Sequence, residues 1–129
     1  MLDAELRCAR EWLGLSDEWL AAHLGVELHT LRQWEAGTSP IPDSVRLTIK
    51  QLEELTAGSV DTLISMFVDR PHPKVSVYHS DAEYHTAAPG AVMPASWHRM
   101  VVMRTANELP GLSIVYAPSR AEASTALSI

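Results

Sequence analysis

Apolar residues in the first half of the chain recur at steps of three and four residues, which is the spacing of one face of a helix. The first stripe consists of Leu2, Leu6, Ala9 and Leu13, and Gly14 is expected to end the helix that carries it. The pattern therefore predicts an N-terminal helix with one buried side.

Two short helices are expected next. Ser16 is a favourable N-cap for the first of them, and Gly25 is expected to stop it. The second is expected over residues 28–36, with Leu31 and Trp34 facing inward. Their one-sided apolar faces place both helices in a bundle with the first.

A longer helix is expected from Pro42-Asp43, which is a favourable helix start. Its inward face is expected to carry Val45, Ile49 and Leu52. Residues 59–68 repeat the pattern, either as a fifth helix or beyond a bend at Gly58. Residues 1–68 are therefore expected to form a helical domain of four to five helices.

The period changes beyond residue 68. Two prolines within residues 69–73 cannot continue a helix, so this segment is expected to be a hinge. The pattern then predicts a strand, a helical turn, a helix and a second strand over residues 74–79, 81–86, 95–109 and 112–117. Residues 69–117 are expected to form a small β-α-β region, and residues 118–129 a flexible tail. The predicted fold class is mainly α, and α+β overall.

The composition excludes several classes of protein. Of the 129 residues, 47% are hydrophobic and 20% are charged, which is typical of a globular chain with one core. No apolar run approaches the ~20 residues that span a bilayer, and the charged N-terminus is expected to be neither a signal peptide nor an anchor. A single cysteine, Cys8, excludes an internal disulfide and a multi-cysteine zinc site, so a cytoplasmic location is expected.

The segment from Asp17 to Glu35 fits the helix-turn-helix template. Small and apolar residues stand where the two helices cross, with a glycine at the turn: Ala21, Gly25, Val26, Leu31 and Trp34. The face of the third helix opposite Leu31 and Trp34 would then be exposed, and in this template that face enters the major groove of DNA.

Four residues occupy that exposed face: Leu28, His29, Arg32 and Gln33. Arg32 can bridge O6 and N7 of a guanine, Gln33 can do the same on an adenine, and Leu28 can touch a thymine methyl group. His29 can meet a base edge or a phosphate. Phosphate contacts are expected from residues with hydroxyl groups, backbone amides or positive charge, namely Ser16, Thr30, Gly37, Thr38, Ser39, Arg46 and Lys50.

The charge of this region opposes DNA binding. The net charge is −6, and residues 1–58 hold five basic side chains against ten carboxylates. Glu27 stands at the N-cap of the third helix, where it would lie close to phosphate. Arg32 has a purely structural alternative, an ion pair with Glu35, Glu27 or Glu11. A two-fold dimer would double every DNA contact and so offset the acidic balance.

The second half of the chain carries no catalytic motif, and no cofactor is predicted. Its four histidines, at positions 72, 79, 85 and 98, show no metal-binding spacing, so no metal site is expected. Cys8 lies beside core positions of a helical segment and is expected to be a buried thiol rather than a nucleophile. The sequence therefore does not predict an enzyme.

The β-α-β region is too small to cover its own strands, because an isolated two-stranded sheet is marginally stable. A homodimer would supply the missing cover. The expected interface residues are Val75, Val77, Tyr78, Trp97, Met100, Val101, Ile114 and Tyr116. The alternative is that the region packs back on helices of its own chain.

Several segments together resemble one known family. They are Glu5-Leu6, Trp34-Glu35-Ala36-Gly37, Ile41-Pro42-Asp43-Ser44-Val45, Tyr84 and Trp97-His98-Arg99. Over residues 1–117 the chain is similar to the anti-CRISPR-associated transcriptional regulators and their relatives with a YdiL-like domain. The resemblance implies a dimeric autorepressor of a small phage or mobile-element operon, bound to an inverted repeat in a bacterial cell or phage-infected host. It also implies that the residues in contact with DNA are Leu28, His29, Arg32 and Gln33.

An alternative of another class stays open, which is a protein-interaction module such as an antitoxin or anti-repressor. It predicts a tight complex with a protein partner and little salt-dependent binding of DNA. RNA stays open as a ligand beside double-stranded DNA, and no membrane partner is expected.

Overall fold

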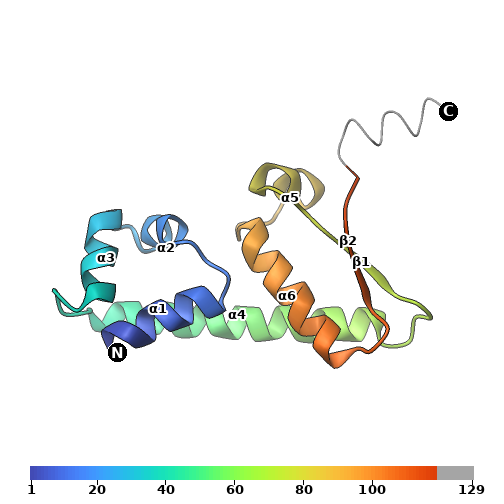
Figure 1. Cartoon of the computed structure of the whole chain (residues 1–129), viewed down its shortest axis with the longest axis horizontal. Helices are drawn as coiled ribbons and strands as arrows, with labels where there is room; N and C mark the ends of the chain where they lie inside the picture. The colour runs from blue at the N-terminus through green and yellow to red at the C-terminus, as the bar shows by residue number, and fades with distance from the viewer. Residues whose placement is uncertain (119–129) are drawn as a thin grey trace. The chain divides into compact units, whose positions relative to one another are not determined.

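The computed structural model describes residues 1–118 and is mainly helical, which confirms the predicted fold class. The order of elements is α1 (Asp3–Trp12), α2 (Asp17–Leu24), α3 (Leu28–Ala36), α4 (Asp43–Phe67), β1 (Lys74–Val77), α5 (Asp81–Ala87), α6 (Ala95–Glu108) and β2 (Ser113–Tyr116) (Figure 1). The chain divides into an N-terminal unit, Met1–Thr62, and a C-terminal unit that starts at Leu63. The predicted flexible tail, apart from Pro118, lies outside the described residues.

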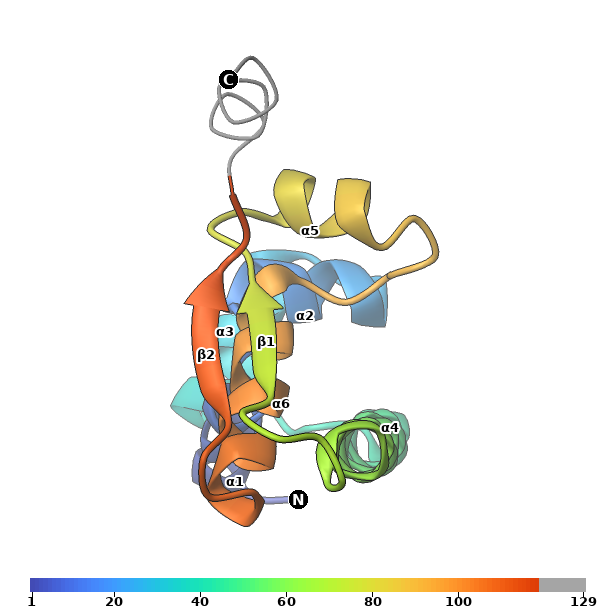
Figure 2. The same cartoon turned by 90° about the vertical axis from the view of Figure 1, so that its right-hand side faces the viewer.

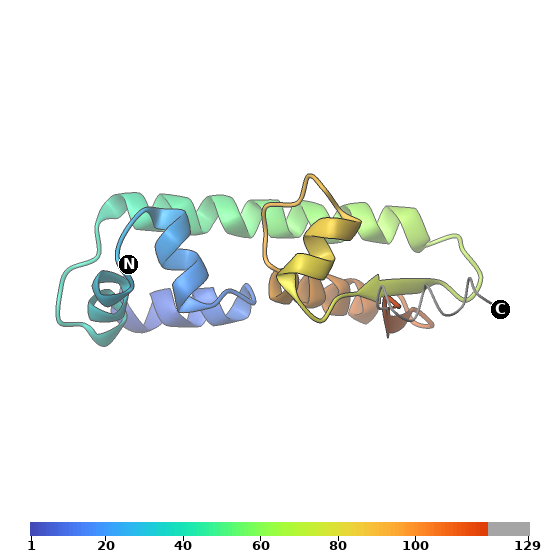
Figure 3. The same ribbon diagram turned by 90° about the horizontal axis from the view of Figure 1, so that it is seen from above.

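The N-terminal unit holds α1, α2, α3 and the part of α4 up to Thr62, and Figure 3 shows the three short helices beside one end of α4. Its fully buried apolar side chains come from every one of these helices or their caps: Leu6, Leu13, Leu20, Leu31 and Ile49. The Ser16 hydroxyl caps α2 by accepting a hydrogen bond from the Trp19 amide. Both α2 and α3 end at a glycine in the left-handed region, where a side chain would strain the backbone, with φ of 71° at Gly25 and 79° at Gly37.

Helix α4 is continuous through Gly58, so both alternatives for residues 59–68, a fifth helix or a bend, are wrong. A glycine inside a helix costs only about 1 kcal/mol relative to alanine, and no proline follows before Pro71. The Thr62 hydroxyl also donates to the Gly58 carbonyl at 2.9 Å. The inward positions Val45, Ile49 and Leu52 are buried as predicted.

The C-terminal unit contains a two-stranded parallel sheet in which Val75 lies opposite Ile114 and Val77 opposite Tyr116. Parallel strands need a long crossover connection, and here α5 and α6 provide it. Figure 2 shows the strands side by side with α6 behind them. Val75 and Val77 are buried with Val102 of α6, and Leu63, Phe67 and Leu112 pack around these three.

One prediction about α1 is wrong, because Cys8 is exposed. The buried side of α1 follows Leu6 and the C-cap residue Leu13, and Cys8 lies two residues after Leu6, which places it about 200° around the helix. Leu2, at the start of the predicted apolar stripe, is also exposed. The backbone amide of Leu2 donates to the Glu5 carboxylate at 3.1 Å.

Candidate nucleic-acid interface

Helix α3 has one buried and one open face. Leu31 and Trp34 are buried, whereas His29 and Arg32 are exposed. Leu28, Thr30 and Gln33 are half-buried. The helix thus presents a polar surface, with His29 and Arg32 most accessible, on the side away from its packed residues.

Apart from Lys50, which lies inside α4, the predicted phosphate-contacting residues lie at or near helix ends of the N-terminal unit. Ser16 is the N-cap of α2, and its hydroxyl is exposed. Gly37 is the C-cap of α3, and the next residue, Thr38, donates from both its amide and its hydroxyl to the Gln33 carbonyl. Ser39 follows in the loop, and Arg46 is exposed on the first turns of α4.

Arg32 is joined to the start of α2. Its Nε donates to Oδ2 of Asp17 at 3.1 Å, and 61% of the Arg32 side chain remains exposed. This hydrogen bond lowers the pKa of Asp17 below its usual value, although burial of the carboxyl acts in the opposite direction. From the sequence, the expected ion-pair partner of Arg32 is Glu35, Glu27 or Glu11. All three predictions are wrong, because the partner is Asp17.

Glu35 instead pairs with Arg10, which sequence reasoning missed. Nε and Nη2 of Arg10 donate to the two Glu35 oxygens at 2.8 and 2.9 Å, and Nη1 donates to the Leu15 carbonyl. Only 12% and 10% of these side chains are exposed. The hydrogen bond to Glu35 raises the pKa of Arg10 further above its usual value. This bidentate pair links α1 to the C-terminal end of α3.

Two carboxylates lie close to the predicted DNA-facing positions. Asp3 lies against Gly37, so closely that a Cβ at position 37 would overlap its Oδ2. Glu27 is the N-cap of α3 and makes no capping hydrogen bond with its side chain. The negative charges of both carboxylates would repel a nearby phosphate and weaken DNA binding.

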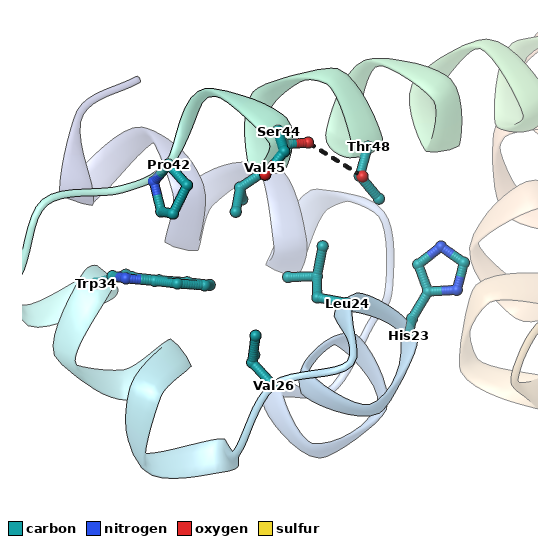
Figure 4. Close-up of a pocket in the computed structure, with 8 residues that line it drawn as sticks. All are labelled: His23, Leu24, Val26, Trp34, Pro42, Ser44, Val45 and Thr48. Atoms are coloured by element: carbon teal, nitrogen blue, oxygen red, sulfur yellow. Dashed lines mark hydrogen bonds between the residues drawn. The ribbon is translucent and has the colours of Figure 1, made fainter.

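A pocket of about 330 Å³ lies under the inner face of Trp34, between α2, α3 and the start of α4 (Figure 4). It is lined by His23, Leu24, Val26, Trp34, Pro42, Ser44, Val45 and Thr48. The Thr48 hydroxyl donates to the Ser44 carbonyl within α4, so it is already satisfied. The pocket is mainly apolar and lies on the packed side of α3, away from Arg32.

The predicted dimer residues divide into two groups in the C-terminal unit. Val75, Val77, Trp97 and Val101 are buried within their own chain, because α6 covers β1. Tyr78 and Met100 are half-buried. Ile114 and Tyr116 on β2 are 38% and 54% exposed, beside an open pocket of about 270 Å³ that Met103 and Arg99 also line. The accessible apolar surface of this sheet is therefore centred on β2.

Three of the four histidines in the C-terminal unit, His79, His85 and His98, have packing or hydrogen-bonding partners, whereas His72 is exposed. His79 stacks on Tyr116 with ring centres 3.6 Å apart, and Nε2 of His85 is 2.8 Å from the Met93 carbonyl oxygen. His98 stacks on Tyr84, and burial followed by the charge of Arg99 lowers its pKa. Within residues 1–118, no three histidine, cysteine or acidic residues are placed to hold a metal ion.

The part of the chain that the structure describes has no helix both long and apolar enough to cross a membrane.

Helix α2, the Gly25 turn and α3, with a buried and an open face on α3, define a helix-turn-helix domain. The family model described as Aca2/YdiL-like matches residues 1–109, and the chain belongs to this family. The match includes residues of both units and confirms the resemblance found in the sequence. The family is of the regulator type, which fits a regulatory role. No curated protein matches the chain significantly.

Proposed function

We propose that the protein is a sequence-specific DNA-binding repressor that acts as a dimer on an inverted repeat and regulates its own small phage or mobile-element operon in the cytoplasm. The observation that carries the proposal is the exposure of His29 and Arg32 on α3 opposite the buried Leu31 and Trp34. The same helix face reads bases in helix-turn-helix proteins. Family membership supports the regulatory role.

The acidic balance reduces non-specific binding more than it opposes specific contacts. Within residues 1–118, three of the five cations of the helical region are paired, namely Arg7, Arg10 and Arg32. Arg46 and Lys50 have no ion-pair partner among the described residues and supply charge for phosphate contacts. Base contacts from two copies would then contribute most of the selectivity.

The proposal is tested by fluorescence anisotropy on the duplex upstream of the protein's own gene, beside a scrambled duplex. Tight binding to the upstream duplex alone is expected, with affinity falling at least about tenfold between low and moderate salt. If the protein binds a specific sequence that lies elsewhere, the upstream duplex will not be preferred, but selection from random duplexes will still yield a preferred sequence. Failure to recover any preferred duplex would contradict the proposal.

The carboxylates Asp3 and Glu27 favour the second candidate, a protein-interaction module such as an antitoxin or anti-repressor. This function predicts equal, feeble binding to both duplexes and a partner gene product that co-purifies with the protein. The anisotropy experiment separates the two functions because only the first gives a sequence preference.

Dimerisation is proposed to use β2 of the C-terminal unit. Replacing Ile114 by glutamate is expected to weaken the dimer at least about tenfold, because a charge would then enter an apolar interface. Val92→Glu is a matched control, since Val92 is 77% exposed in the loop before α6. Analytical ultracentrifugation measures both variants. Equal dimer constants for wild type and Ile114→Glu would exclude this surface.

A further inference from the structure

The ion pair between Asp17 and Arg32 uses only Nε of the arginine and leaves its two terminal nitrogens without a hydrogen-bond partner within residues 1–118. Asp17 accepts a hydrogen bond from Nε alone, and no other hydrogen bond of the Arg32 guanidinium is formed within residues 1–118. The pair between Arg10 and Glu35 differs, because it occupies both Nε and a terminal nitrogen of Arg10. Arg10 is mostly buried, whereas 61% of the Arg32 side chain is exposed.

Asp17 is itself held in place. It is the first residue of α2, directly after the Ser16 cap, and its Oδ1 accepts a hydrogen bond from the Glu18 amide at 2.8 Å. Its other oxygen, Oδ2, accepts the hydrogen bond from Nε of Arg32. The carboxylate therefore links the backbone of α2 to the guanidinium on α3.

We propose that Asp17 is a positioning residue for DNA readout: it holds Nε of Arg32 so that the two terminal nitrogens donate end-on to O6 and N7 of one guanine in each half-site. The inference rests on the proposed DNA-binding function. A free arginine has many rotamers and loses them on binding, so a side chain ordered in advance binds with a smaller entropic cost. The bidentate match to guanine needs the terminal nitrogens in one plane and direction.

This role accounts for a carboxylate close to a DNA-facing surface. The negative charge weakens binding to every duplex through repulsion of phosphates. The positioning of Arg32 by Asp17 strengthens binding only to duplexes that have a guanine opposite Arg32 in the half-site. The result is a larger ratio of specific to non-specific affinity at the expense of overall affinity.

The test compares Asp17→Ala with Glu18→Ala in the full chain. Glu18 is the next residue in the first turn of α2, is exposed, and forms no ion pair within residues 1–118, so its replacement makes the same change in charge. The probes are the duplex selected by wild type and the same duplex with 7-deazaguanine, which lacks N7. Anisotropy gives the affinities, and thermal unfolding checks that both variants are folded.

Asp17→Ala is expected to reduce the ratio of specific to scrambled affinity about tenfold, whereas Glu18→Ala raises both affinities alike. Wild type should lose affinity on the 7-deazaguanine duplex, and Asp17→Ala should lose less. In an Arg32→Ala background, Asp17→Ala should behave as Glu18→Ala does. A rise in the affinity ratio in Asp17→Ala would overturn the proposal, because Asp17 would then be withholding Arg32 from DNA.

A second readout does not depend on DNA. NMR order parameters of the Arg32 Nε–H group in the free protein should show a rigid group in wild type and in Glu18→Ala, and a mobile group in Asp17→Ala. Equal mobility in all three proteins would overturn the positioning role. Absence of any preferred duplex for wild type would instead contradict the proposed function, so the two failures are distinguishable.

Discussion

Replacing Arg32 by alanine is expected to weaken binding of the operator duplex at least about 30-fold. A bidentate arginine–guanine contact contributes about 1–3 kcal/mol, and a two-fold dimer makes the contact twice, so the loss is about 2 kcal/mol or more. The side chain is exposed and pairs only with Asp17 among residues 1–118, so the fold should remain intact. Anisotropy titration at fixed salt measures the affinity, and circular dichroism checks the fold.

The control for this variant is Arg7→Ala. Arg7 carries the same charge, is 66% exposed, and forms a comparable ion pair with Glu11 on α1. Its removal should weaken binding to operator and scrambled duplexes equally and slightly, because only a general electrostatic term changes. Equal losses in the two variants would contradict base readout by Arg32.

Replacing Gln33 by alanine should also lower the affinity for the operator duplex, and it should relax the sequence preference at an adenine position.

Replacing Glu35 by alanine is expected to lower the free energy of unfolding by about 3 kcal/mol. The mutation removes both oxygens that receive Arg10, and it leaves a guanidinium that is only 12% exposed without its counter-charge. Breaking a buried pair from one side is costly because the remaining charge stays desolvated. Urea denaturation followed by circular dichroism measures the change.

Two further variants separate this effect from a general loss of charge. Glu11→Ala breaks the exposed Arg7–Glu11 pair and should leave the urea midpoint unchanged. The double variant Arg10→Met/Glu35→Leu replaces both charges with apolar groups and should recover most of the stability, because no charge is left buried. A Glu35→Ala midpoint equal to that of wild type would show that the pair does not contribute to stability.

Local signals were sufficient to predict most of the secondary structure. The observed bounds of α3, Leu28–Ala36, agree with the predicted ones because a glycine with positive φ stops the helix directly after them. The capping of α2 by Ser16 and the burial of Leu31 and Trp34 likewise follow from neighbouring residues. These features depend on a few positions along the chain, so a single sequence reveals them.

The ion pairs could not be predicted in the same way. Arg10 and Glu35 are 25 residues apart, and Arg32 and Asp17 are 15 apart, so no helical spacing connects them. Their pairing depends on how α1, α2 and α3 pack. The exposure of Cys8, by contrast, follows from local spacing, because Cys8 lies about 200° around α1 from the buried Leu6.

The parallel pairing of β1 with β2 has a consequence for the order of folding. Residues 78–112 must be brought into a closed loop before the two strands can form their first hydrogen bonds, whereas α1, α2 and α3 pack with close neighbours along the chain. Loop closure costs more entropy for distant contacts, and such contacts form more slowly. The helical unit is also synthesised first. Helix α3 is therefore expected to be assembled while the sheet is still open, and closure of the sheet is expected to be the late step in the folding of this chain.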